Sequence, residues 1–290
     1  MTATSETSTT NSLRVALPKG RMLEGLKQLL LEAGLPIAVD YRNYRVQLGD
    51  RPWTTKLLKP QNVVEMLHAG SRDLGFAGAD WVAELDADVV ELVDTRLDPV
   101  TVVVAEPRSG VASDGPLVVA SEYERLTRRW MEKQKLSARF VRSYGSTEVF
   151  PPEDADMIVD NTATGATLRA NGLRIRDEIL RSSTRLYANP CALEDPEKRR
   201  AIDDFRLLVE SVLSARSRSM VELNVSADDL ERVAAALPCL REVTVAPLYR
   251  EGGFAIKAAI PRDTLPDVLP RVRDLGGRDI IVTRIDQLVG

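Results

Sequence analysis

The sequence predicts a large α/β body followed by a smaller α+β unit, and three observations indicate this fold class. From Leu13 onward, short apolar runs alternate with amphipathic stretches of helical spacing, which is typical of parallel sheets covered by helices. Beyond residue 219 the order changes to strand, helix, two strands, helix and strand. The chain has 290 residues, of which 44% are hydrophobic, enough to bury more than one core.

In the body, apolar runs predict strands at residues 13–17, 73–78, 100–105, 117–120, 138–142 and 157–160. Helical spacing predicts helices at residues 22–33, 60–69 and 121–134, and another directly after Gly78. The helix at 121–134 is expected to start with a capping box formed by Ser121 and Glu124. Strands that alternate with helices predict a parallel sheet with helices on its faces.

The C-terminal unit is predicted from residue 220 to the end of the chain. Strands are expected at 220–225, 243–248, 254–260 and 279–285, and helices at 226–237 and 264–275. Ser226 and Asp229 are expected to cap the first of these helices. The resulting βαββαβ order predicts a ferredoxin-like unit. The segment "SARSRS" (214–219) is the expected linker, and by analogy the unit behind it would regulate or assemble the protein.

Composition excludes several classes of function. The net charge is -4, from 39 basic and 43 acidic residues, so the chain lacks the basic footprint of a nucleic-acid-binding protein. No apolar run approaches the length that a membrane-spanning helix needs. The Ser/Thr-rich residues 1–12 have no apolar core, so we expect a disordered tail and not a signal peptide.

Cysteine and histidine content narrow the chemistry further. Cys191 and Cys239 are far apart in sequence, and we expect reduced thiols in a cytoplasmic protein. His68 is the single histidine of the chain, so a metal site built from several histidines is excluded. A catalytic triad would have to use this one residue.

The stretch "MIVDNTATGATLRANG" (157–172) carries the strongest functional pattern. A strand that ends in Asp160 leads through small and hydroxylated residues into a helix. Free N–H groups at the start of a helix bind phosphate, and a carboxylate at the end of a strand suits sugar hydroxyls. We therefore predict that Asp160 holds a ribose and that the following loop holds its phosphate, through residues Ala163, Thr164, Gly165, Ala166, Thr167 and Leu168. An ordinary capped helix would give the same pattern.

Two other strand-to-helix turns carry polar residues. "LPKGR" (17–21) places Lys19 and Arg21 where a polyphosphate could bind, although solvated surface charge is the simpler explanation. "DLGFAGAD" (73–80) brings Asp80 to a third such turn, where it could merely cap a helix. Neither the P-loop nor the G-x-G-x-x-G pattern occurs in the chain.

Taken together, these segments resemble the long form of ATP phosphoribosyltransferase, the first enzyme of histidine biosynthesis. The resemblance rests on "LRVALPKGRM", "GSRDLGFAGADWVAEL", "YGSTEVFPP", "ADMIVDNTATGATLRANGLRI" and "ALPCLREVTVAPL", and it runs from about Leu13 to the C-terminus. It implies a two-lobed catalytic body similar to periplasmic binding proteins. The implied domains are lobe I at 13–98 and 186–214, lobe II at 99–185, and a histidine-sensing regulatory domain at 217–290.

The resemblance also implies a reaction and its participants. N1 of ATP would attack C1 of phosphoribosyl pyrophosphate and release pyrophosphate in the presence of Mg2+, in a homo-oligomer that is a dimer or a hexamer. Asp160, Lys19 and Arg21 would be the catalytic residues, and Asp80 and Glu148 further substrate contacts in the same cleft. The metal ligands are not identified by the sequence. Adenine N1 has a free lone pair, so positioning and charge stabilisation suffice in a chain with one histidine.

Two departures from the family pattern stand out. The regulatory motif P-T-x-S-P is replaced here by Val243, Thr244, Val245, Ala246 and Pro247, from which we expect weakened inhibition by histidine. The segment "RPWTTKLLKPQNV" (51–63) also differs from the usual theme. Three alternatives stay open: a phosphoribosyltransferase of type I, a two-lobed ligand sensor, and a non-catalytic paralogue that regulates a partner.

Overall fold

The computed structural model describes residues 12–290 apart from 41, 43, 112–114, 241 and 251. It consists of two compact units, one formed by residues up to Gln28 with Leu35–Asp204, the other by Leu29–Gly34 with Phe205–Gly290. Of the predicted N-terminal tail only Ser12 is described, and its hydroxyl donates to the Pro52 carbonyl (2.7 Å); the rest lies outside the described residues. Within the described part of the chain, no helix is long and apolar enough to cross a membrane.

The first unit contains a ten-stranded sheet that serves two lobes, in the order β2-β3-β4-β1-β5-β10-β6-β9-β7-β8. In lobe I, β1 (Arg14–Pro18) pairs in parallel with β4 (Thr54–Leu58) and β5 (Leu74–Gly78). The antiparallel hairpin of β2 (Ile37–Asp40) and β3 (Arg45–Leu48) extends this sheet. The helices are α1 (Arg21–Glu32), α2 (Pro60–His68) and α3 (Ala79–Leu85). The apolar residues of α2 pack on β1 and β5 because they recur at helical spacing: Val63, Val64 and Leu67 are fully buried.

Lobe II is built on β9 (Met157–Thr162), β7 (Leu117–Ser121) and β8 (Ala138–Arg142), which pair in parallel. Its helices are α4 (Glu124–Lys133), the short α5 (Ala166–Ala170) and the 3-10 turn η1 (Thr147–Val149). Trp130 and Met131 of α4 pack against Val159 and Met157 of β9, which forms the core of this lobe.

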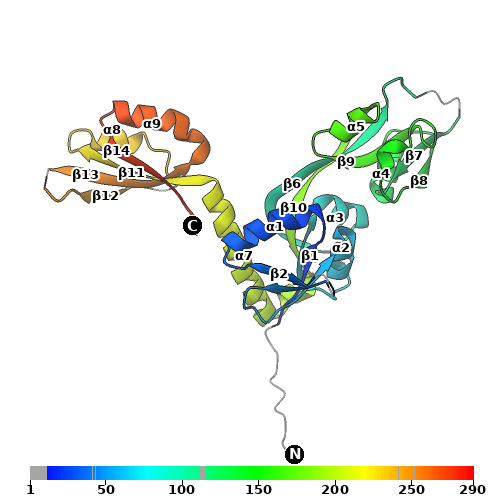
Figure 1. Ribbon diagram of the computed structural model, residues 1–290, viewed down its shortest axis with the longest axis horizontal. Coiled ribbons are helices and arrows are strands. Elements are labelled where there is room, and N and C mark those ends of the chain that lie inside the picture. The colour runs from blue at the N-terminus through cyan, green and yellow to red at the C-terminus, as the bar shows by residue number, and fades with distance from the viewer. Residues whose placement is uncertain (1–11, 41, 43, 112–114, 241, 251) are drawn as a thin grey trace, which may run out of the picture. The chain divides into compact units, whose positions relative to one another are not determined.

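Two long strands run through both lobes. β6 (Val90–Pro107) and β10 (Leu173–Ala188) pair antiparallel along their whole length, and Figure 1 shows them running together from lobe I into lobe II. Their register shifts between Ser182 and Thr184, opposite Val100 and Leu97. In the same segment Arg96 (φ 57°) and Asp98 (φ 47°) adopt the left-handed conformation, which is uncommon for residues with side chains. The lobes are therefore joined by two irregular strand segments placed side by side.

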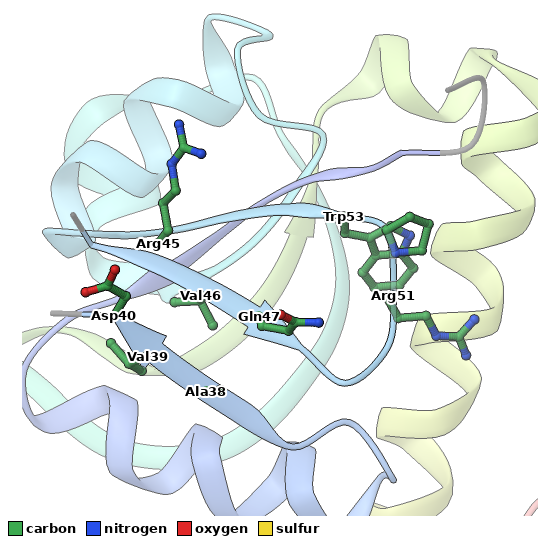
Figure 2. A pocket seen from close by; sticks show the side chains of 9 residues that line it. Ala38, Val39, Asp40, Arg45, Val46, Gln47, Arg51 and Trp53 are labelled. Carbon is green, nitrogen blue, oxygen red and sulfur yellow. The ribbon is translucent and has the colours of Figure 1, made fainter. Parts of the chain in front are cut away.

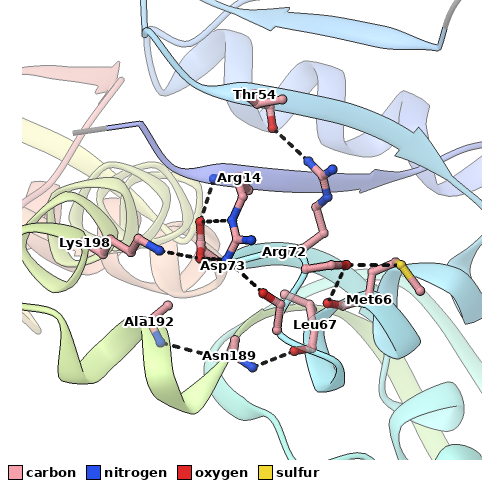
Figure 3. Close-up of polar contacts among 11 residues, drawn as sticks. Arg14, Thr54, Met66, Leu67, Arg72, Asp73, Asn189, Ala192 and Lys198 are labelled. Atoms are coloured by element: carbon pink, nitrogen blue, oxygen red, sulfur yellow. Dashed lines mark hydrogen bonds and ion pairs between the residues drawn. The ribbon is translucent and has the colours of Figure 1, made fainter. Parts of the chain in front are cut away.

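Asp73 connects β1 of lobe I to the segment that follows β10. Asp73 is only 1% exposed, and it accepts hydrogen bonds from the Arg14 backbone N–H (2.8 Å), the Arg14 guanidinium (2.6 and 3.0 Å) and Lys198 Nζ (3.0 Å). Figure 3 shows these side chains converging on Asp73 from β1 and from α7 (Pro196–Arg216). Burial opposes the charge, but the hydrogen bonds from Arg14 and Lys198 outweigh it and lower the pKa of Asp73. Asn189, the N-cap of α6 (Pro190–Glu194), donates to the Asp73 carbonyl (3.0 Å).

The second unit confirms the predicted βαββαβ order. Its elements are β11 (Arg218–Ser226), α8 (Leu230–Ala235), β12 (Thr244–Pro247), β13 (Gly253–Pro261), the 3-10 turn η2 (Arg262–Thr264), α9 (Leu265–Asp274) and β14 (Arg278–Arg284). The sheet order is β12-β13-β11-β14, and neighbouring strands are antiparallel. Alternate residues of β11 and β13 face Val233, Val268 and Val272 of the two helices. Ser226 and Asp229 exchange hydrogen bonds, but they do so in the turn before α8, which starts only at Leu230 with Asp229 as its N-cap residue.

Two local predictions are wrong. Ser121 does not cap α4: it lies in β7, its hydroxyl donates to the Val159 carbonyl (2.6 Å), and α4 starts only at Glu124. The segment 214–219 is not an irregular linker, because α7 extends to Arg216 and β11 starts at Arg218. In both places a regular element continues through residues whose composition is typical of caps and linkers.

Candidate active site

A polar pocket lies between the two lobes of the first unit, with a cavity volume of about 210 Å³. Its walls come from the β1–α1 turn, the β5–α3 turn, the crossing strands β6 and β10, and β9. The residues that line it are Lys19, Arg21, Met22, Pro60, Gly78, Asp80, Trp81, Asp98, Val100, Asn161, Ser182, Ser183 and Thr184. Carboxyl ends of parallel strands thus meet the crossing strands, the position where α/β folds bind ligands.

Two exposed cations stand at the N-terminus of α1. Lys19 and Arg21 flank Gly20, whose φ of 85° makes the sharp turn from β1 into the helix. Lys19 Nζ lies 5.5 Å from the centre of the Tyr44 ring. The N-terminus of a helix carries partial positive charge, so two cations there repel the dipole. Such a local conflict is typical of a site that receives an anion.

Asp80 is the most buried acid in the pocket wall, at 5% exposure. Its carboxylate accepts hydrogen bonds from the Tyr123 hydroxyl (2.6 Å) and the Ser182 hydroxyl (2.6 Å). Gly78 precedes it because a Cβ at that position would lie 2.2 Å from Asp80 Oδ1. The buried carboxylate of Asp80 therefore has two hydroxyl donors as hydrogen-bond partners, one from lobe II and one from β10.

Tyr123 connects Asp80 to β9. Its hydroxyl accepts a hydrogen bond from Asn161 Nδ2 (2.9 Å) while it donates to Asp80. Burial and the neighbouring charge of Asp80 raise the pKa of Tyr123 well above its usual range, so the phenol stays neutral and keeps its proton. The ring also stacks on Trp81, with centroids 4.7 Å apart. Polar contacts thus run from lobe I to lobe II at the back of the pocket.

The loop after β9 makes a tight turn at Gly165 into the short helix α5. Gly165 adopts φ 70°, and its N–H donates to the Thr162 hydroxyl (2.9 Å). Arg169 stabilises the turn because its guanidinium donates a hydrogen bond to the Thr164 carbonyl (2.9 Å). Ala163, Thr164, Ala166 and Thr167 are exposed, whereas the Leu168 side chain is buried in the core of lobe II. Leu168 can therefore offer only its backbone to a ligand.

Asp160 lies half-buried at the end of β9, beside Asn161 of the pocket wall. Burial raises the pKa of Asp160 to about 6; the Asn161 N–H (2.7 Å) opposes the rise, and the charges of Glu148 and Glu122 add to it. A carboxylate in this setting gains most from donors that replace water without adding negative charge. Sugar hydroxyls are donors of this kind.

A second hollow, of about 500 Å³, lies on the β2–β3 hairpin and contains none of the predicted site residues. Figure 2 shows Asp40 and Arg51 at opposite ends of it, with Gln47 between them. Arg51, Pro52 and Trp53, which line it, belong to the segment where the sequence departs from the family pattern. The Arg51 guanidinium stands 5.6 Å from the Trp53 ring centre.

The predicted residues therefore fall into two groups. Lys19, Arg21 and Asp80 line the interlobe pocket together, while Asp160, Glu148 and the loop 163–168 lie outside its lining, joined to it through Asn161. His68 is remote from this chemistry, and its Nδ1 accepts the Asp88 N–H (3.0 Å). Sequence reasoning missed Tyr123, Asn161 and Asp98. It also missed the hydroxyls of β10, although three consecutive hydroxyl residues in "RSSTR" (181–185) are a usable signal.

Comparison with known proteins agrees with this geometry. Residues 59–211 match the family model described as ATP phosphoribosyltransferase, and residues 215–287 match that of its C-terminal domain. The ATP phosphoribosyltransferase of Chlorobium phaeobacteroides is 32% identical over 288 residues, which cover 96% of this chain and 98% of that protein. The enzyme of the same name from Pelotomaculum thermopropionicum is 33% identical over 278 residues, 93% of this chain and 96% of its own.

A solved structure gives the same result for the fold. The ATP phosphoribosyl transferase (HisG:HisZ) complex from Thermotoga maritima contains a chain with 25% identity and a TM-score of 0.61. The match covers 68% of this chain and 98% of that one. Since relatives of one name align over nearly the whole sequence and the family model spans both lobes, the chain belongs to the ATP phosphoribosyltransferase family.

Proposed function

We propose that the interlobe pocket is where ATP and phosphoribosyl pyrophosphate react in the first step of histidine biosynthesis. Adenine N1 forms a bond to C1 of the ribose, and the electron pair of the broken C1–O bond leaves with pyrophosphate. The observation that carries the proposal is that this pocket joins the cationic β1–α1 turn to β9, next to the ribose-phosphate loop, in a chain of this family.

We assign the ribose 5-phosphate to the loop 163–168. First-turn N–H groups of a helix are available to an anion, and Thr164 and Thr167, at the start of α5, are exposed residues with hydroxyl donors. Asp160, at the start of the same loop, would accept hydrogen bonds from ribose hydroxyls. Bound this way, the sugar would present C1 toward the pocket wall at Asn161. Orientation of this kind supplies much of the rate of a displacement that needs no strong base.

Lys19 and Arg21 would neutralise the phosphates of ATP or the departing pyrophosphate. Negative charge grows on the leaving group as the C1–O bond breaks, so fixed cations favour the transition state over the ground state. Asp80 and Tyr123 would form the polar floor of the same site, and Glu148 would act on it through Asp160. None of these roles requires a histidine.

The donor set fits Mg2+ that arrives with the substrates. Among the described residues, no cluster of three or more His, Cys, Asp or Glu side chains could hold a metal by itself. Mg2+ is commonly held by substrate phosphates and one or two carboxylates. Asp98 lines the pocket, and its Oδ2 accepts a hydrogen bond from the Thr184 hydroxyl (3.1 Å). Asp98 would hold the ion, which would supply charge neutralisation at the diphosphate.

We further propose that the C-terminal unit is the regulatory domain and that histidine is its effector. The match to the family's C-terminal domain supports this assignment. β12 carries Ala246 in an exposed edge strand, where the family motif has serine. Loss of that hydroxyl supports weak inhibition. We also propose that the protein is a homo-oligomer, either a dimer or a hexamer. We propose a cytoplasmic location because the reaction consumes ATP.

The experiment is an absorbance assay with ATP, phosphoribosyl pyrophosphate and Mg2+, drawn forward by inorganic pyrophosphatase. Substitution at N1 changes the near-ultraviolet absorbance of adenine, so product forms visibly. A rise that requires both substrates is expected. Binding of both substrates without a rise would instead favour a non-catalytic paralogue, and absence of binding would overturn the site.

A further inference from the structure

Helix α4 of lobe II receives its N-terminal cap from lobe I. The Glu84 carboxylate, on α3, accepts the backbone N–H of Arg125 through Oε1 (3.0 Å) and that of Leu126 through Oε2 (2.9 Å). Glu84 is 6% exposed. No side chain of the local N-cap residue, Tyr123, bonds to the helix start. A residue about forty positions earlier, in the other lobe, thus does the work of a cap.

The contact between the Glu84 carboxylate and the start of α4 is favourable for two reasons. First-turn N–H groups have no partner within their own helix, and the positive end of the dipole attracts a carboxylate. Asp86, the C-cap residue of α3, forms ion pairs with Arg125 (2.6 Å) and Arg129 (3.6 Å) of α4. The start of α4 is therefore bound to α3 by a buried acid, Glu84, and by an exposed acid, Asp86.

The contact between α3 and α4 also connects to the pocket. Asp80 stands four residues before Glu84 on α3, and Tyr123 immediately precedes α4. The Asp80–Tyr123 hydrogen bond (2.6 Å) and the Trp81–Tyr123 stack connect the same pair of elements on the pocket side. Any separation of α3 from α4 would pull Tyr123, and with it Asn161, away from the lobe I wall.

We propose that Glu84 is a positioning residue, an interlobe latch that holds the two substrate-binding walls at working distance. The inference rests on the proposed function of the pocket. Glu84 does not line the pocket, so it acts through α4 and not on substrate. When the latch is lost, the binding-competent arrangement is a smaller fraction of the population, and apparent affinity falls by that fraction. Saturating substrates restore the arrangement, so turnover at saturation is nearly preserved.

The test uses Glu84→Gln and Glu84→Ala in the full chain, with Glu132→Ala as the matched control, since Glu132 is an exposed acid on α4. We expect Glu84→Ala to raise KM for both substrates about tenfold with kcat within about twofold of wild type. Glu84→Gln should give an intermediate KM, because its amide oxygen accepts one N–H and its NH2 group cannot accept the other. The control should match wild type.

Hydrogen exchange at Arg125 and Leu126 gives the second measurement. Exchange there should accelerate in both Glu84 variants and slow again when ATP and phosphoribosyl pyrophosphate are added together. Faster exchange with unchanged KM would reduce Glu84 to a helix cap, and a fall in kcat at constant KM would place it in the chemistry; either result overturns the latch. If Glu84→Ala does not fold, the graded KM and exchange of Glu84→Gln decide.

These outcomes separate the latch from the function on which it rests. Absence of turnover in the wild type would overturn the proposed function. The exchange experiment would still test the latch in that case, because substrate-induced protection of α4 in the variants requires only binding. Absence of that protection, with binding seen by calorimetry, would overturn the latch alone.

Discussion

Replacement of Asp160 by asparagine should stabilise the fold while it strongly lowers activity. The side chain keeps its size but loses a charge that is half-buried near Glu148 and Glu122. The pKa of this carboxyl rises from 3.8 to about 6 on folding. At about 1.4 kcal/mol per pKa unit, the charged form destabilises the folded chain by about 3 kcal/mol as an upper figure. Partial solvent screening lowers the expected gain to about 2 kcal/mol.

The gain must depend on pH with a definite sign. Because the pKa is raised in the folded state, the protonated carboxyl contributes stability below about pH 3.8, and this contribution is lost as the pH rises through 6. The advantage of Asp160→Asn is therefore complete at pH 7.5 and about half as large at pH 5. Ribose hydroxyls lose a charged acceptor at the same time, so kcat/KM should fall about 100-fold.

Urea denaturation followed by tryptophan fluorescence measures the effect, since Trp130 packs in the core beside β9. Asp154→Asn is the control, because Asp154 is an exposed acid of the same lobe. An Asp160→Asn variant that is less stable than wild type at pH 7.5, or equally favoured at pH 5 and 7.5, would refute the reasoning about burial. Unchanged kcat/KM would refute the ribose assignment independently.

Arg21→Gln should lower kcat/KM about 100-fold and raise the free energy of unfolding by about 0.5 kcal/mol, because a cation leaves the positive end of α1; lower stability with full activity contradicts this. Asp73→Asn should cost about 3–5 kcal/mol of stability by urea denaturation, since Arg14 and Lys198 lose a buried partner. In the wild type, the depressed pKa of Asp73 means that the carboxylate's contribution to the free energy of unfolding is lost only as the pH falls below about 4. A difference in stability between wild type and variant that does not change below about pH 4 would contradict this. Thr164→Val should raise KM for phosphoribosyl pyrophosphate about tenfold with an unchanged melting temperature; an unchanged KM would remove Thr164 from the loop's role. Ala246→Ser should strengthen inhibition by histidine in the absorbance assay, and an identical inhibition curve would show that the hydroxyl does not matter.

The sequence predicted those parts of the fold whose periodicity is local. The βαββαβ unit is confirmed because each of its elements is bounded by a turn and alternates cleanly, as in β11. β6 was predicted only at residues 100–105, because its N-terminal half alternates charged residues whose partners lie on β10, such as Glu91 with Arg185 (2.7 Å). Pairing between distant segments is not visible in a single sequence. The β2–β3 hairpin was missed for the same reason.

The candidate site divides in a similar way. Some turns can be predicted because a glycine and a charged residue follow an apolar run. Lys19, Arg21 and Asp80 were predicted in this way, and they line one pocket. Tyr123 was hidden in what the pattern indicated as the start of a helix, with Ser121 as its cap, although its hydroxyl links Asp80 to Asn161. Its role depends on a contact across 43 residues, which no local pattern encodes.

The pairing of β6 with β10 has a consequence for exchanging parts of the chain. Pro107 stands opposite Leu173, and the Arg108 N–H donates to the Gly172 carbonyl (3.0 Å), so the two ends of the segment between them lie side by side. Residues 108–172 are thus a single continuous insertion whose ends are already adjacent. Such an arrangement tolerates transplantation and circular permutation. We therefore expect that residues 108–172 can be exchanged between relatives as one cassette, which would carry the loop 163–168 of one relative into the body of another.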